Sequence, residues 1–208
     1  MSKYEEKSLT LETSKNLGGA GALLIFLGPI LSALPAGIGG WVGILSLVGA
    51  ILVLVALKGF ADYYKEQGIF KNTLYAIVVA IVGVVLFVVL VISVTVDFFN
   101  ALGLNITNLQ DWSSLSSINW QSLNMDLVFR FAGTLLLNAV VAFVFLIITA
   151  VFLRKSLVLM ANKTGVGMFG TTGLMLLIGA ILTIIFIGPI LVWIAMLLLA
   201  VAFFSVKT

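Results

Sequence analysis

Six long runs of apolar residues make up most of this chain, and they constrain its fold more than any other feature. The runs cover about 17–34, 38–57, 74–96, 127–153, 166–187 and 190–206. A helix needs about 20 apolar residues, rising 1.5 Å each, to cross the hydrocarbon core of a bilayer. The chain is 62% hydrophobic and 9% charged, against about 25% charged in soluble domains. The pattern predicts an all-α, polytopic membrane bundle with six transmembrane helices.

The basic residues fall in alternate connections between these runs. Segments 1–16, 58–72 and 154–165 and the C-terminal tail contain every Lys and Arg except Arg130. These basic residues are Lys3, Lys7, Lys15, Lys58, Lys65, Lys71, Arg154, Lys155, Lys163 and Lys207. With six spans, all of these segments lie on one side of the membrane, and the positive-inside rule makes that side cytoplasmic.

The charge pattern therefore predicts three helical hairpins in the cell membrane, with both termini in the cytoplasm. Residues 1–16 form a cytoplasmic segment, and residues 17–206 form the transmembrane domain. An odd number of spans would distribute the basic residues over both sides. The opposite side then carries Arg130 and the aspartates Asp97, Asp111 and Asp126.

Glycine and proline mark the expected breaks between runs. Pro35 lies between the first two runs, and Gly188–Pro189 separates the last two. Both residue types suit tight turns. A hairpin at Pro189 is favoured over one kinked helix because residues 166–206 are too long for a single span. In the connection 58–71, mixed charges and aromatic residues indicate a short interfacial helix ending at Gly68. A docking surface for a partner is the alternative.

The one sizeable external segment is expected at about 97–126. Leu109, Trp112, Trp120 and Leu123 fall within an arc of roughly 80° at helical spacing. Either an amphipathic helix at headgroup level or a loop over the mouth of the bundle explains them. Asn105-Ile106-Thr107 is a glycosylation sequon on the side where Asn105 could be modified.

The two ends of the chain echo each other. Residues 26–31, Phe-Leu-Gly-Pro-Ile-Leu, match 186–191, Phe-Ile-Gly-Pro-Ile-Leu, at five of six positions. A duplicated hairpin covering 17–58 and 169–207 is one explanation. Chance convergence in apolar sequence is the other, because the spacing between the shared glycines differs.

Two polar groupings are candidate sites. Asn138 lies deep in the fourth run with Thr134 one turn before it. Asn138 could hydrogen-bond between helices or line a pore. Asp126 and Arg130 at the outer end of that run are spaced to form an interfacial ion pair, or alternatively a gate.

Glycines in the first, second and fifth runs indicate close helix packing. The candidate packing positions are Gly18, Gly21, Gly28, Gly39, Gly43, Gly173 and Gly179.

The residue inventory excludes several chemistries. The chain has no Cys and no His, which removes disulfides, thiolates and the commonest metal ligands. No nucleotide or hydrolase motif occurs, so we expect no cofactor, no metal, no catalytic residue and no nucleic-acid partner. The leading hypothesis is a non-enzymatic accessory or scaffold subunit, or a homo-oligomer, with lipid and membrane proteins as partners. A small-solute channel or transporter near Asn138 is the alternative, and a lipid-acting membrane enzyme is the third.

Four stretches also resemble a known family. They are Ser14 to Leu24, Leu57 to Tyr64, Gly173 to Leu182, and Ala202 to Lys207. They are similar to the DUF996 family of small, largely archaeal, multi-span membrane proteins without assigned function. The resemblance implies a polytopic membrane protein and contributes no catalytic residue.

Overall fold

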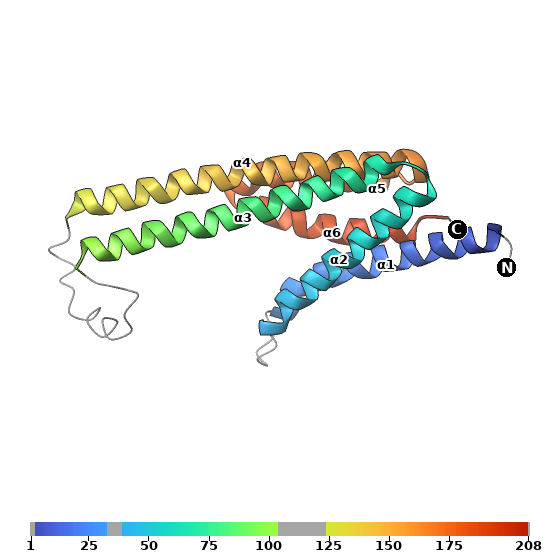
Figure 1. The fold of residues 1–208 in the computed structure, drawn as a ribbon, viewed down its shortest axis with the longest axis horizontal. Helices are drawn as coiled ribbons and strands as arrows, with labels where there is room; N and C mark the ends of the chain where they lie inside the picture. Colours follow the sequence, from blue (N-terminus) through green and yellow to red (C-terminus); the bar gives the residue numbers. More distant parts are fainter. Residues whose placement is uncertain (1–2, 33–38, 104–123, 208) are drawn as a thin grey trace. The chain divides into compact units, whose positions relative to one another are not determined.

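A computed structural model of the chain describes residues 3–32, 39–103 and 124–207. Within these residues the protein is helical and has no strand, which confirms the all-α prediction (Figure 1). The elements are α1 (Lys3–Ser32), α2 (Gly39–Tyr63), α3 (Gln67–Ala101), α4 (Met125–Thr164), α5 (Met168–Leu182), η3 (Thr183–Ile185) and α6 (Gly188–Phe204).

Five of these elements include stretches long and apolar enough to cross a membrane. The stretches are Leu11–Leu31, Gly43–Tyr63, Gln67–Ala101, Met125–Thr164 and Gly167–Ile185, and α6 is a shorter apolar helix of 17 residues. Within the described residues, each predicted apolar run thus coincides with helix over most of its length. The helices extend past the predicted runs: α1 begins at Lys3, inside the segment 1–16 that was predicted to lie outside the membrane domain.

The chain divides into two compact units. Unit 1 contains Met1–Val79 and Ile147–Thr208, and unit 2 contains Ala80–Leu146. Unit 1 therefore holds α1, α2, α5, α6 and the adjoining ends of α3 and α4. Unit 2 holds the remainder of α3 and α4.

In unit 1, α1 and α2 pack antiparallel through facing glycines. A Cβ atom added at Gly21 would lie 2.6 Å from the carbonyl oxygen of Gly49, and one added at Gly49 would lie 2.6 Å from the carbonyl oxygen of Gly21. Toward the other end of the pair, Ser14 lies against Gly59. Only glycine allows two backbones to come this close, which is a common way for helices to associate in lipid.

The first and last helices also pack against each other. Gly18 lies under the ring of Phe203, where an added Cβ would be 2.6 Å from the ring. Trp193 of α6 stacks on Phe26 with ring centroids 4.9 Å apart, and its Nε1 donates a hydrogen bond to the Phe26 carbonyl oxygen at 2.8 Å. Pro29 lies inside α1 and has no N–H to donate within the helix. The bond that Pro29 cannot make would end on the carbonyl oxygen of Ile25. The tryptophan thus donates to the next carbonyl along α1, one residue from the gap in the hydrogen-bond ladder.

Helices α5 and α6 form a hairpin, which excludes the alternative of one kinked helix. An added Cβ at Gly179 would lie 2.8 Å from Val192 Cγ2, and Gly188 lies against the Gly179 carbonyl. The break, however, precedes the predicted position. Phe186 takes the left-handed conformation at φ 63°, and Gly188 and Pro189 form the first turn of α6. Proline is well suited to that position because its missing N–H has no partner there in any case.

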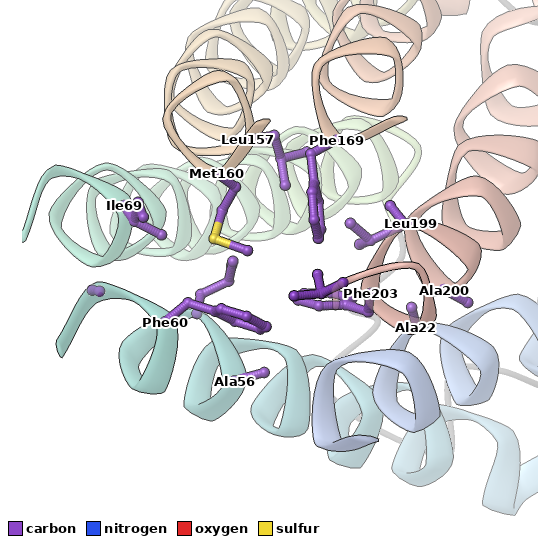
Figure 2. Packing of buried hydrophobic residues seen from close by; sticks show 14 of the residues in the cluster. Ala22, Ala56, Phe60, Ile69, Leu157, Met160, Phe169, Leu199, Ala200 and Phe203 are labelled. Atoms are coloured by element: carbon purple, nitrogen blue, oxygen red, sulfur yellow. The ribbon is translucent and has the colours of Figure 1, made fainter. Parts of the chain in front are cut away.

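The core of unit 1 is built from aromatic rings and small residues (Figure 2). Phe203 lies 5.8 Å from Phe60 and 5.1 Å from Phe169 between ring centroids, and all three side chains are fully buried. Met160 and Ile69, also fully buried, complete the cluster. These residues come from α2, α3, α4, α5 and α6, so this cluster ties the ends of the helices in unit 1 together.

The expected interfacial helix between the second and third runs is replaced by a tight turn. α2 continues through Tyr63, and α3 already begins at Gln67. Lys65 reverses the chain in the left-handed conformation, at φ 54°. Residues 58–71 are thus mostly helical, as predicted, but they form the end of α2 and the start of α3 rather than a separate helix.

Candidate functional site

Asn138 of α4 is the most unusual polar residue in unit 2. Its side chain is 4% exposed, and among the residues that the structure describes its Nδ2 has no hydrogen-bond partner. Such an unpaired buried donor costs about 1–3 kcal/mol. The residue lies in the antiparallel pair of α3 and α4, whose register in this unit is set by contacts of Phe145 with Gly83 and of Phe98 with Phe131.

The structure separates Thr134 from Asn138. Thr134 is exposed, and its hydroxyl donates to the Arg130 carbonyl oxygen of its own helix at 2.8 Å. A sequence spacing of four residues was therefore not enough to bring the two into one site. The hydroxyl of Thr134 needs no partner from another helix.

Asp126 and Arg130 are both exposed at the start of α4. Within the described part of the chain no ion pair joins them, so the interfacial pair stays a prediction. Asn124 caps the helix instead: its Oδ1 accepts a hydrogen bond from the Asp126 backbone N–H at 2.9 Å. Asp126 also lies in the first turn of α4, where a negative charge is favourable.

Most of the predicted packing glycines are used within the chain. Gly18 faces α6, Gly21 faces α2, Gly173 faces Arg154 and Leu157 of α4, and Gly179 faces α6. Gly28 is buried in α1. Gly43 has nothing within 4 Å of an added Cβ, so it makes no close contact in the chain. Gly39 begins α2, and its surroundings lie outside what the structure describes.

The two echoed motifs occupy different places. Gly28 and Pro29 lie near the end of the first helix of one hairpin, whereas Gly188 and Pro189 begin the second helix of the other. Phe26 stacks on a tryptophan, while Phe186 is 88% exposed in a turn. The difference favours chance convergence over a duplicated hairpin.

A buried pair of hydroxyl groups on two helices was not predicted from the sequence. Thr73 Oγ1 and Ser156 Oγ are 2.8 Å apart, and each lies within hydrogen-bond distance of the Ile69 carbonyl oxygen. Both residues are buried, and the pair joins α3 to α4 in unit 1. No periodic signal could have revealed it, because single Thr and Ser residues in apolar helices usually bond to their own backbone.

Two basic residues of unit 1, Lys65 and Lys163, lie at the turns that join its helices. Lys163 Nζ pairs with Glu66 Oε2 at 3.2 Å, which ties the end of α4 to the α2–α3 turn. In that turn burial raises the pKa of Tyr64 above its ordinary value of 10.0, and the nearby Tyr63 raises it further. Tyr64 is therefore neutral at physiological pH.

The predicted external segment and its candidate glycosylation site lie mostly outside the described residues. Asn105, Leu109, Trp112, Trp120 and Leu123 fall in residues 104–123, outside the described residues. Among the residues that the structure does describe, no group of three or more acidic side chains could hold a metal ion.

The described helices make up an all-α protein with five stretches long and apolar enough to cross a bilayer. Residues 45–197 match the model of a protein family of unknown function, DUF996, and the chain belongs to that family. The match confirms the resemblance seen in the sequence. An uncharacterized protein of Methanocaldococcus jannaschii, MJ1644, is 27% identical over 197 residues, which cover 95% of this chain and 93% of that protein. No solved structure matches the chain.

Proposed function

We propose that this protein crosses the cell membrane six times as three hairpins, with both termini in the cytoplasm, and acts by helix assembly rather than catalysis. The sidedness is supported by Lys58, Lys65, Lys71 and Lys163, which flank or lie in the turns on one side of the predicted bundle. Assembly means a homo-oligomer, or an accessory or scaffold subunit of a membrane complex.

The observation that carries this proposal is the uncovered surface of α3 and α4. Of the most apolar 18-residue stretch, only 6% is buried in α3 and 11% in α4, against 28–33% in α1, α2 and α5. Unit 2 consists of one pair of helices, whereas membrane and soluble bundles commonly enclose a core between four. A second copy of unit 2 would complete such a packing. The glycine faces of unit 1 do not serve this purpose because they are occupied within the chain.

We therefore expect single cysteines at Val89 and Leu136 to cross-link two copies of the protein. These residues are 57% and 68% exposed on α3 and α4. The chain has no native cysteine, so the background is zero. Oxidative or short bismaleimide cross-linking in native membranes, read as a dimer on a denaturing gel, measures the effect.

The matched control is Ile194→Cys, on the 43%-exposed face of α6. Dimers at Val89→Cys and Leu136→Cys but not at Ile194→Cys support assembly through α3 and α4. Equal cross-linking at all three positions, together with a monomeric particle in mild detergent, contradicts it.

A second candidate function, a small-solute channel or transporter, is favoured by Asn138. The buried side-chain amide of Asn138 has no hydrogen-bond partner for its Nδ2 among the described residues, so this donor is available to a bound solute. Polar residues inside the membrane often mark a ligand or ion path.

Asn138→Leu tests whether the Asn138 amide has an unpaired donor or joins two helices by a hydrogen bond. We expect the variant to raise the free energy of unfolding by about 1 kcal/mol, because leucine removes an unpaired buried donor. If Asn138 instead joined helices by a hydrogen bond, stability would fall by about 0.6–2 kcal/mol. Unfolding in mixed detergent micelles measures the change. Thr134→Val, which changes an exposed side chain, should shift stability by no more than about 0.5 kcal/mol.

Solute flux into reconstituted vesicles provides the functional arm of the same experiment. Flux that is present in the wild type and lost in a stable Asn138→Leu variant would favour transport over assembly. No flux in either protein leaves assembly as the better proposal.

A further inference from the structure

Two parallel stripes of residues on α3 and α4 in unit 1 combine positive charge, aromatic rings and apolar side chains in the same order. On α3 the stripe runs through Lys71, Tyr75 and Val78, and on α4 it runs through Lys155, Phe152 and Ile148. The spacings of three and four residues place each set on one helix face. In both stripes the amine comes at the end nearer the helix-joining turns and the apolar residue comes last.

Ring contacts bring the two stripes together. Lys155 Nζ lies 5.5 Å from the centroid of the Phe152 ring, and Phe152 lies 5.6 Å from the ring of Tyr75 at an interplanar angle of 59°. Tyr75 is 53% exposed, and both lysines are exposed. The cluster is thus a preformed surface open to the surroundings of the helix pair.

The charges at this surface are not neutralised by the protein. Among the described residues neither Lys71 nor Lys155 forms an ion pair. Of the carboxylates at the α2–α3 turn, Glu66 pairs with Lys163, and Asp62 accepts a hydrogen bond from Gln67 Nε2 at 3.0 Å. An anionic group at this surface would therefore meet two amines that have no carboxylate partner among the described residues.

We propose that this surface binds the phosphate headgroup of an anionic phospholipid, with an acyl chain lying along the apolar part of the stripes. Lysines hold the phosphate as point charges. The phenol ring of Tyr75 lies at the level where aromatic residues meet headgroups. Val78 and Ile148, 50% and 39% exposed, offer the acyl chain an apolar bed. This inference rests on the proposed membrane location of the protein.

Native mass spectrometry of the full chain, released from a mild non-ionic detergent, tests the proposal. Phosphatidylglycerol is titrated against phosphatidylcholine, and the apparent Kd of each is measured. We expect tighter binding of phosphatidylglycerol. Lys71→Gln and Lys155→Gln should each weaken it about fivefold, and the double variant about thirtyfold. Lys155→Arg should retain most of the binding.

Arg130→Gln is the matched control, since Arg130 is an exposed cation in unit 2 and outside the stripes. An equal loss in Arg130→Gln, or equal binding of the two lipids, overturns the proposal. Equal binding of glycerol phosphate shows that the ligand is a free phosphate rather than a lipid. Tight binding of polyglutamate that displaces phosphatidylglycerol would instead identify a protein-docking surface. The unfolding temperature of each variant in detergent checks that it is folded.

Carbonate extraction of the wild type from cell membranes separates this inference from the proposed function. Release of the chain by carbonate contradicts the membrane location itself. Retention in the membrane, combined with no preference for phosphatidylglycerol, contradicts only the lipid site.

Discussion

Gly21→Ala is expected to destabilise the protein by about 2 kcal/mol or more, although alanine is the better helix former. The new Cβ would lie 2.6 Å from the Gly49 carbonyl oxygen and 2.9 Å from Leu52 Cβ. The first of these atoms belongs to the backbone and cannot move aside as a side chain could. Overpacking of this kind typically costs 1–3 kcal/mol, and it would force α1 and α2 apart.

The control is the same substitution at Gly43, where nothing lies within 4 Å of the added atom. Gly43→Ala should be neutral or should stabilise by about 0.5–1 kcal/mol through helix propensity. The two variants are compared by unfolding in mixed detergent micelles. Equal effects of the two substitutions would mean that the close contact of α1 and α2 does not exist in the membrane.

Phe203→Ala is expected to lower the free energy of unfolding by about 3 kcal/mol. The ring is fully buried between Phe60 and Phe169, and it also covers Gly18. Removing it leaves a cavity bordered by several helices, and Phe→Ala changes in cores cost 3–5 kcal/mol. The lower end follows from the proposed membrane location, because lipid-embedded helices gain little from the hydrophobic effect and depend on packing.

Phe129→Ala serves as the reference for this second variant because Phe129 is 68% exposed. Its loss of stability should not exceed about 0.5 kcal/mol. Thermal unfolding followed by circular dichroism in the same detergent gives both values. A loss at Phe203 no larger than that at Phe129 would show that the aromatic cluster does not hold unit 1 together.

The sequence predicted the helical class well because hydropathy reports directly on the solvent around a helix. In the part of the chain that the structure describes, all six apolar runs coincide with helix over most of their length, and the predicted pairing of α5 with α6 is found. Gly21, Gly173 and Gly179 could be identified as packing positions because lipid-embedded helices need small residues to approach each other. The number of membrane crossings and the side of the termini remain predictions.

The features that the sequence did not predict share a physical reason. Each depends on contacts between residues of different helices. Residues 58–71 carry helix-forming sequence, but the reversal at Lys65 depends on how α2 and α3 are held by their neighbours. Thr73 and Ser156 are 83 positions apart, and nothing in either local sequence encodes their contact. Likewise, a spacing of four residues could not show that Asn138 is buried while Thr134 is exposed.

The hydrogen bond from Trp193 to the Phe26 carbonyl has a consequence for biogenesis. Its two partners are 167 residues apart in the chain, so α1 leaves the ribosome long before its partner in α6 exists. The carbonyl oxygen of Phe26 must therefore wait for this donor until α6 has been synthesised. A nascent chain stalled before α6 would hold the first hairpin without this support from the indole.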